Sequence, residues 1–167
     1  MRASPTHRSF LRRSSAGFTV VELIAVIVVL GIVSAMALPR LTDRSAFQAR
    51  GFEDEVLAAL RHARALAVAS GCAVQVSIAG NGYTLNQQTG CDVGGFTLAV
   101  PDPATQAPIY AGAAPAGITL NGPASFVFTT LGEATVAGAP ANVVLNVGGN
   151  ANRTITVFGT TGFAQAQ

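Results

Sequence analysis

One carboxylate stands inside an otherwise apolar stretch near the start of the chain. The 21 residues from Phe18 to Leu38 carry a single charged side chain, Glu22. A carboxylate near the centre of a bilayer costs roughly 2.5–3.5 kcal/mol, and less near the edge, so Glu22 is expected to have a partner. Cutting the chain between Gly17 and Phe18 would create an α-amino group one helical turn before Glu22, on the same chain or on a neighbouring copy. These residues predict an acid that pairs with a new terminal amine, so that helices assemble side by side in lipid.

The apolar run follows a basic segment. Residues 1–17 contain four of the ten arginines and no acid, whereas the remainder carries six arginines against eight acids. As a helix the run would span about 30 Å, the thickness of the hydrocarbon core, and a basic flank favours retention of the preceding segment in the cytoplasm. A signal peptide would have a shorter apolar region, and a plain membrane anchor would leave Glu22 unexplained. We therefore expect a leader at residues 1–17 that is removed and a transmembrane helix at residues 18–38.

A second helix is predicted over residues 39–71, continuing the first. Pro39 removes one backbone donor and crowds the preceding turn, so a kink is expected there. Apolar and small residues recur at steps of three and four and form one stripe: Phe52, Val56, Ala59, Leu60, Ala63, Leu66, Ala67 and Ser70. Five polar residues fall off this stripe and are predicted to face solvent: Glu53, Asp54, Arg61, His62 and Arg64. Gly71 follows directly, as suits a helix end.

From Cys72 onward the periodicity changes to that of strands. Residues 73–78 and 83–87 alternate, and between them lies Asn81-Gly82, a dipeptide typical of a two-residue hairpin turn. Counting outward from that turn along both strands brings Cys72 opposite Cys91. A disulfide between them would fit a head outside the cytoplasm. The alternatives are two free buried thiols, or a metal pair that lacks two further ligands at useful spacing.

Five further strands are predicted at residues 96–100, 118–120, 126–128, 142–147 and 153–158. Between the first two of them, Pro101–Gly117 is rich in Pro and Ala and is expected to be a surface loop. The predicted fold class is α+β. A long, kinked N-terminal helix has its first half in the membrane, and its second half packs on an antiparallel β-sheet head formed by residues 72–167.

Little in the sequence predicts catalysis. The chain has no lysine, which excludes Schiff-base chemistry and a phosphate-loop lysine, and only 11% of its residues are charged. No Ser/His/Asp set with a spare histidine and no metal-ligand cluster stands out, and a loop surface explains Asp92 and Asp102 better than a catalytic pair does. We expect a protein that is not an enzyme and that binds no cofactor and no metal.

The stretch from Gly17 to Leu23 resembles the prepilin processing site of type IV pilins and type II secretion pseudopilins. In that family a dedicated peptidase cleaves after the glycine and methylates the new N-terminal phenylalanine, and a glutamate directs stacking into a helical filament. The resemblance implies cleavage between Gly17 and Phe18, N-methylation of Phe18 and a filament-assembly role for Glu22. Pro39 falls at the position of the family's helix-bending proline.

The C-terminal half is similar to the GspH/FimT family of minor pseudopilins in its strand spacing and its glycines: Phe126-Val-Phe128 with Gly132, and the strand from Arg153 with Gly159 and Gly162. This resemblance implies a minor pseudopilin of a type II secretion system, passing once through the bacterial inner membrane with its head in the periplasm. The implied partners are other pseudopilins or pilins, the prepilin peptidase, the inner-membrane assembly platform and the lipid bilayer.

The alternative is a minor pilin of a type IV pilus, which would act in pilus initiation, twitching motility or DNA uptake. Members of the family that bind DNA use arginines in a C-terminal tail, whereas this chain has no basic residue after Arg153. Because affinity for DNA rises with the number of phosphates neutralised, DNA binding is disfavoured.

Overall fold

The structure is a computed structural model that describes residues 18–37, 44–91, 93–149 and 152–167. The chain divides into two compact units, Met1–Leu41 and Thr42–Gln167, and each is described by itself. In the described part of the first unit there is one helix, α1, from Val20 to Ala37. The predicted kink at Pro39 lies outside the described residues.

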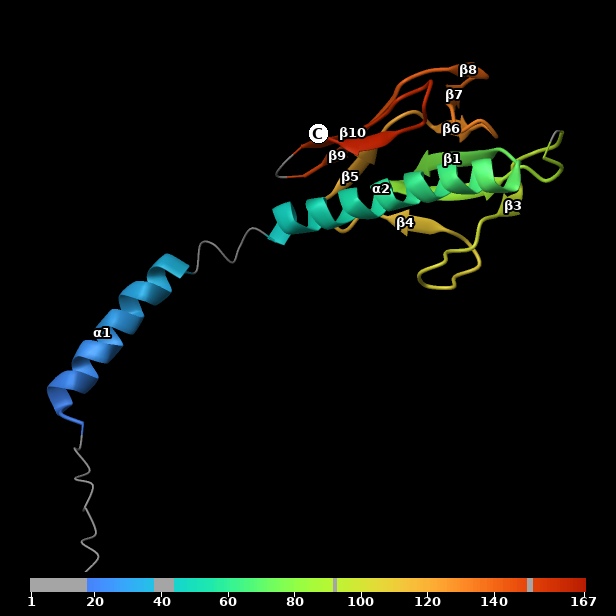
Figure 1. Cartoon of the computed structure of the whole chain (residues 1–167). Helices are drawn as coiled ribbons and strands as arrows, with labels where there is room; N and C mark the ends of the chain where they lie inside the picture. The colour runs from blue at the N-terminus through green and yellow to red at the C-terminus, as the bar shows by residue number, and fades with distance from the viewer. Residues whose placement is uncertain (1–17, 38–43, 92, 150–151) are drawn as a thin grey trace, which may run out of the picture. The chain divides into compact units, whose positions relative to one another are not determined.

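The second unit is a head built on one long helix, α2, from Arg44 to Ser70 (Figure 1). Gly71, predicted to follow the helix end, has a positive φ of 67°, a conformation that favours glycine directly after a helix. The strands are β1 (Val74–Ala79), β2 (Gly82–Gln87), β3 (Leu98–Ala99), β4 (Ala111–Ala113), β5 (Thr119–Asn121), β6 (Ser125–Phe128), β7 (Ala134–Val136), β8 (Ala139–Pro140), β9 (Val143–Gly148), β10 (Arg153–Val157) and β11 (Ala164–Ala166).

The described strands form two antiparallel sheets. The larger has the order β3-β2-β1-β6-β7-β8, with β4 also paired to β2, and the smaller has the order β11-β10-β9-β5. Helix α2 contacts β1, β2 and β6 of the larger sheet and β9, β10 and β11 of the smaller one, so it packs across both (Figure 1). The predicted α+β class, with a helix packed on an antiparallel head, is confirmed.

The core of the head lies between α2 and the sheets, as the helical stripe and the alternating strands require. Its largest fully buried apolar side chains come from the helix and from both sheets: Val56, Leu60, Val74, Val76, Leu85, Val100, Phe126, Phe128, Val143, Leu145 and Ile155. On β6 the rings of Phe126 and Phe128 meet edge to face, with their centroids 5.5 Å apart. One core thus joins the two sheets.

The turn of the first hairpin lies one residue earlier than predicted, so the predicted strand register is wrong. The turn residues are Gly80 and Asn81, both with positive φ (57° and 62°), and Ala79 pairs with Gly82. A Cβ on Gly82 would lie 2.7 Å from the carbonyl oxygen of Gly112 on β4. Gly82 is therefore a glycine because β4 approaches it closely, not because it forms the turn.

That close approach also corrects the loop prediction for Pro101–Gly117. Residues Ala111–Ala113 form β4, which pairs with the start of β2 through Gly82↔Ala113, Tyr83↔Gly112 and Thr84↔Ala111. The short strands β7, β8 and β11 were also missed. Each has only two or three residues, so alternation had too few positions to reveal them.

Candidate functional site

The start of α1 is capped by a threonine that precedes it. The backbone N–H of Glu22 donates to Thr19 Oγ1 at 3.2 Å, and the N–H of Leu23 donates to the Thr19 carbonyl at 3.1 Å. A threonine hydroxyl that accepts from the third helical N–H is a standard N-cap. The cap fixes where the helix begins, so Phe18 lies just outside it.

Phe18, the predicted N-methylation site, and Glu22, the predicted filament-assembly residue, therefore lie on either side of the helix start. Phe18 is 78% exposed, and Glu22 is exposed in the first turn of α1. A negative charge is favourable there because the helix N-terminus carries a partial positive charge. Among the described residues no cation forms an ion pair with the Glu22 carboxylate. Gly17, the predicted cleavage site, lies outside the described residues.

From Val20 to Ser34 the side chains of α1 are exposed around the helix. Those of the large residues from Val20 to Val33 are between 45% and 76% exposed. A helix that is apolar on every side requires an apolar partner. Of the helices in the described ranges, none combines the length and the apolarity needed to cross a membrane.

In the head, one carboxylate is buried against a strand. Glu53 on α2 is 1% exposed and forms an ion pair with the Nε of Arg153 on β10 through its Oε2 atom. Its other oxygen, Oε1, is buried and has no hydrogen-bond partner among the described residues. The prediction that Glu53 faces solvent is wrong, because Arg153 supplies the countercharge that lets an acid lie under the sheet.

A second contact between helix and sheet involves a buried tyrosine. Tyr83 on β2 donates its hydroxyl hydrogen to Glu55 Oε1 at 2.9 Å, and its ring lies 6.4 Å from that of Phe52. Burial of the phenol, followed by its hydrogen bond to Glu55, raises the pKa of Tyr83 far above its ordinary value. Tyr83 is thus a neutral donor that joins β2 to α2.

The loop before β4 rests on the same helix. Tyr110 stacks on His62 with the ring centroids 5.3 Å apart, and burial raises the pKa of the Tyr110 phenol. His62 is only half-buried, but it is not the freely solvated residue that the sequence predicted. Asp102 is held by its own loop: hydrogen bonds from the Thr105 hydroxyl, at 2.6 Å, and from the Ala104 N–H lower its pKa. These contacts position the loop that carries Asp102, and Asp92 lies outside the described residues.

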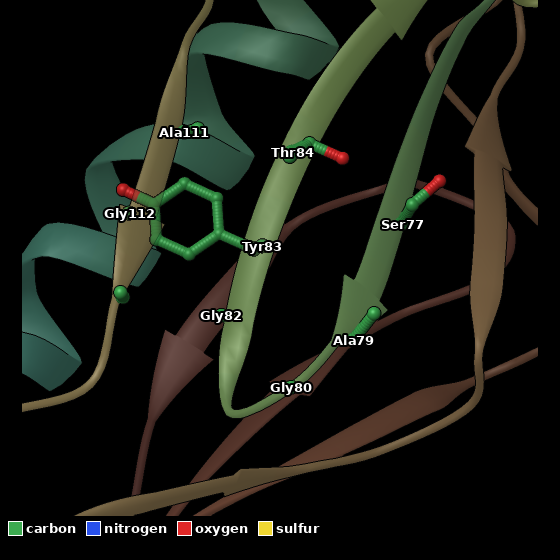
Figure 2. A pocket seen from close by; sticks show the side chains of 9 residues that line it. Ser77, Ala79, Gly80, Gly82, Tyr83, Thr84, Ala111 and Gly112 are labelled. Atoms are coloured by element: carbon green, nitrogen blue, oxygen red, sulfur yellow. The ribbon is translucent and has the colours of Figure 1, made fainter.

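A hollow of about 350 Å³ opens beside the β1–β2 turn (Figure 2). Small residues make up most of its wall, including Ala79, Gly80, Gly82 and Gly112. The polar groups there are the hydroxyls of Ser77, Thr84 and Tyr83, and Tyr83 already donates to Glu55. Its lining contains no carboxylate, imidazole or cationic side chain.

Cys72 and Cys91 are joined in a disulfide, with their Cα atoms 4.1 Å apart. The hairpin register that led to this pairing differs from the observed one: the ladder ends where the Gln88 N–H donates to Ala73. Cys91 then reaches Cys72 from a turn and has a positive φ of 54°. Within the described part of the chain, no three His, Cys, Asp or Glu residues gather into a metal-binding group.

An apolar helix with one acid in its first turn, together with a second helix packed on an antiparallel β head, defines a pilin-like subunit. The family described as "Type II transport protein GspH" matches residues 54–161, and the motif described as "Prokaryotic N-terminal methylation motif" matches residues 12–38. The chain belongs to the GspH family. It is a type IV pilin-like minor subunit, a class of structural proteins that assemble with other pilins.

Two solved structures share this fold. The type IV minor pilin FimU of Pseudomonas aeruginosa is 16% identical with a TM-score of 0.52, and the match covers 75% of this chain and 89% of FimU. The minor pseudopilin EpsH from the type 2 secretion system of Vibrio cholerae is 18% identical with a TM-score of 0.52, covering 74% of this chain and 95% of EpsH. No curated protein matches the sequence.

Sequence reasoning singled out Gly17, Phe18 and Glu22, whose roles stay predictions, and it missed the polar contacts of the head. Glu53–Arg153 and Glu55–Tyr83 each join the helix to a strand far away in the chain. Only one signal was available: Glu53 lies between Phe52 and Val56, close to the edge of the apolar stripe.

Proposed function

We propose that this chain is a minor pseudopilin of a type II secretion system. Prepilin peptidase cleaves it between Gly17 and Phe18 and methylates the new amine of Phe18. The first helix then sits in the inner membrane, with the head in the periplasm, until the assembly platform adds the subunit to a filament. The match to the N-terminal methylation motif and the match to the GspH family support this proposal.

The observation that carries the proposal is the state of Glu22. Its carboxylate lies in the first turn of a helix whose apolar side chains are exposed, and no cation among the described residues pairs with it. The hydrogen bond that the Glu22 N–H donates to Thr19 Oγ1 caps the helix at Thr19, which leaves the Phe18 nitrogen outside the helical hydrogen bonds. After cleavage that nitrogen is a cation about one turn from Glu22, and the same cation on a neighbouring subunit satisfies the acid equally well.

Replacing Glu22 tests this role. In cells that assemble the filament, Glu22→Ala should still be cleaved and inserted in the membrane, but its recovery in sheared or cross-linked filaments should fall at least about tenfold. Val21→Ala, in the same turn, is the matched control and should assemble normally. A mass measurement of wild-type protein should give a chain that begins at methylated Phe18. Normal assembly of Glu22→Ala would refute the pairing of acid and amine.

Assembly into a type IV pilus is the second candidate, and the likeness to FimU agrees with it as a fold. The tail favours secretion, because no basic residue follows Arg153 and a DNA-uptake role would benefit from cationic side chains there. A deletion strain separates the two: loss of secreted enzymes with normal twitching and transformation supports the pseudopilin, and the reverse pattern supports the pilin.

A further inference from the structure

The short strand β4 forms an edge of the larger sheet and leaves backbone groups without partners. It pairs with β2 on one side, and none of the strands in the described ranges pairs with its other side. Every second residue on this stretch bonds to β2, beginning with the Tyr110 carbonyl, which accepts from the Leu85 N–H. Ala111 and Ala113 therefore direct their N–H and C=O groups away from β2. Both residues are exposed, so these four groups are accessible to a partner.

This edge lacks the usual protection against pairing with another strand. Exposed edge strands commonly carry charged side chains or a proline, which discourage the addition of a further strand. The chain has no charged residue between Asp102 and Glu133, and β4 itself reads Ala-Gly-Ala. The strand is therefore a ready template for one more strand.

The hollow beside the β1–β2 turn adjoins the same edge (Figure 2). Its wall includes Ala111 and Ala113 of β4 and Gly82 and Thr84 of β2, whose side chains share the outer face of the sheet. Because these side chains are small, the outer face is recessed there, and its volume of about 350 Å³ has room for a bulky side chain. Alternate residues of an added strand would point toward this recess.

On the inner face of β4, the carboxylate of Glu55 lies against Gly112. A Cβ on Gly112 would collide with Glu55 Oε1, the oxygen that accepts the Tyr83 hydroxyl hydrogen. Glu55 is exposed and forms no ion pair with any described residue. An added antiparallel strand would place one residue opposite Gly112, with the two Cα atoms about 4.5 Å apart and its side chain on this inner face. A lysine or arginine at that position would meet the carboxylate.

We propose that β4 binds an extended segment of another protein, which joins the larger sheet as an antiparallel strand. The segment has a basic residue opposite Gly112 and a bulky apolar residue on each side of it. Hydrogen bonds to Ala111 and Ala113 supply affinity, while Glu55 and the hollow select the side chains. The β4 strand of a second copy fits less well, because it would bring two Glu55 carboxylates together and offer only alanine to the hollow. This site lies in the head and does not depend on the filament role of Glu22.

Peptide binding tests the backbone pairing. The probe is a labelled seven-residue peptide, Thr-Val-Phe-Lys-Phe-Val-Thr, with both ends blocked. Full-length protein in mild detergent should bind it saturably in fluorescence anisotropy, and methylating the backbone nitrogens of both phenylalanines should raise the dissociation constant at least about tenfold. Bound peptide should also slow amide hydrogen exchange at Ala111 and Ala113 at least about tenfold, whereas Gly112, already bonded to β2, should change little. No binding, or binding without protection of those two amides, overturns the proposal.

Substitutions on α2 test the choice of the basic residue. A peptide with glutamate in place of lysine should bind at least about tenfold more weakly, and Glu55→Gln should reduce this difference to less than about threefold. Asp54→Asn removes the neighbouring acid of α2, which is also exposed, and is the matched control that should preserve the difference. An unchanged preference for lysine in Glu55→Gln contradicts the proposed pairing.

Substitutions on β2 test the hollow. Thr84→Leu fills it and should weaken binding of the lysine peptide at least about fivefold. Asn86→Leu, two residues along the same face of β2 and outside the lining, is the control and should change binding less than about twofold. Equal effects of the two variants would overturn the role of the hollow. Protection of Ala111 and Ala113 without peptide, in protein that sediments as a dimer, would assign the edge to a second copy and also overturn the proposal.

Discussion

Two glutamates of this chain lie beside apolar side chains, and only one has its countercharge inside the described chain. Glu53 is buried under the sheets and meets Arg153 from β10. Glu22 stands in the first turn of α1 and pairs with no cation among the described residues. The buried acid of the head thus has its countercharge within the head, whereas the acid of the first helix has none among the described residues.

The apolar residues of the two helices differ in the same way. Helix α2 buries one stripe in the core of the head, while the side chains of α1 from Val20 to Ser34 are exposed on every side. Since burial of apolar surface is the main stabilising contribution to folding, we expect the head to be stable by itself and α1 to need an apolar partner such as lipid or another subunit. The same chemical change should therefore have different consequences in the two units.

The largest expected effect comes from one leucine truncation made in both units. Leu85 on β2 is fully buried, so Leu85→Ala should lower the free energy of unfolding of the head by about 3 kcal/mol. Leu30 on α1 is 57% exposed, and Leu30→Ala should leave that free energy within about 0.5 kcal/mol of wild type. Urea unfolding of full-length protein in detergent, followed by circular dichroism, compares the two. Equal losses of unfolding free energy in the two variants would contradict the view that the head folds by itself while α1 needs an apolar partner.

Breaking the buried ion pair is the next test. Arg153→Met leaves the Glu53 carboxylate buried without a countercharge and should cost about 3 kcal/mol of unfolding free energy. Adding Glu53→Leu should recover most of that loss, because the double variant has no buried charge. Arg50→Met, at an exposed position of α2, is the matched control and should cost less than about 0.5 kcal/mol. If Arg153→Met costs no more than this control, the ion pair contributes nothing to the free energy of unfolding of the head.

The disulfide is expected to stabilise the head by a similar amount. A bond between Cys72 and Cys91 closes a loop with a sequence separation of 19, which stabilises a fold by about 3 kcal/mol, mainly by restricting the unfolded chain. Replacing both cysteines with alanine should lower the head's free energy of unfolding by that amount and leave membrane insertion of the first helix unchanged. Non-reducing mass spectrometry checks the bond directly, and two alkylatable thiols in native protein would remove this contribution.

The sequence predicted what depends on local patterns. The N-terminal motif is continuous in the chain, and the long helix and the longer strands have clear periodicities. Predictions from the sequence were wrong where one residue type can serve two structural roles. Gly82 suited a turn but serves the approach of β4, and Glu53 suited a solvent face but meets Arg153, one hundred residues later. Such contacts are set by the tertiary arrangement, which no local pattern encodes.

The smallest expected effect on stability is at Tyr83, where variants distinguish the contribution of burial from that of the hydrogen bond. Tyr83→Phe removes the hydroxyl that donates to Glu55 and should cost about 1 kcal/mol at neutral pH. Above pH 10.0, the ordinary pKa of tyrosine, the unfolded phenol ionises while the folded one stays protonated, so wild-type stability should fall as the pH rises. That alkaline loss should shrink in Tyr83→Phe. Because burial is the main cause of the raised pKa of Tyr83, the Glu55→Gln variant should still lose most of this stability at alkaline pH. If Glu55→Gln shows no alkaline loss of stability, the raised pKa comes from the Glu55 carboxylate instead.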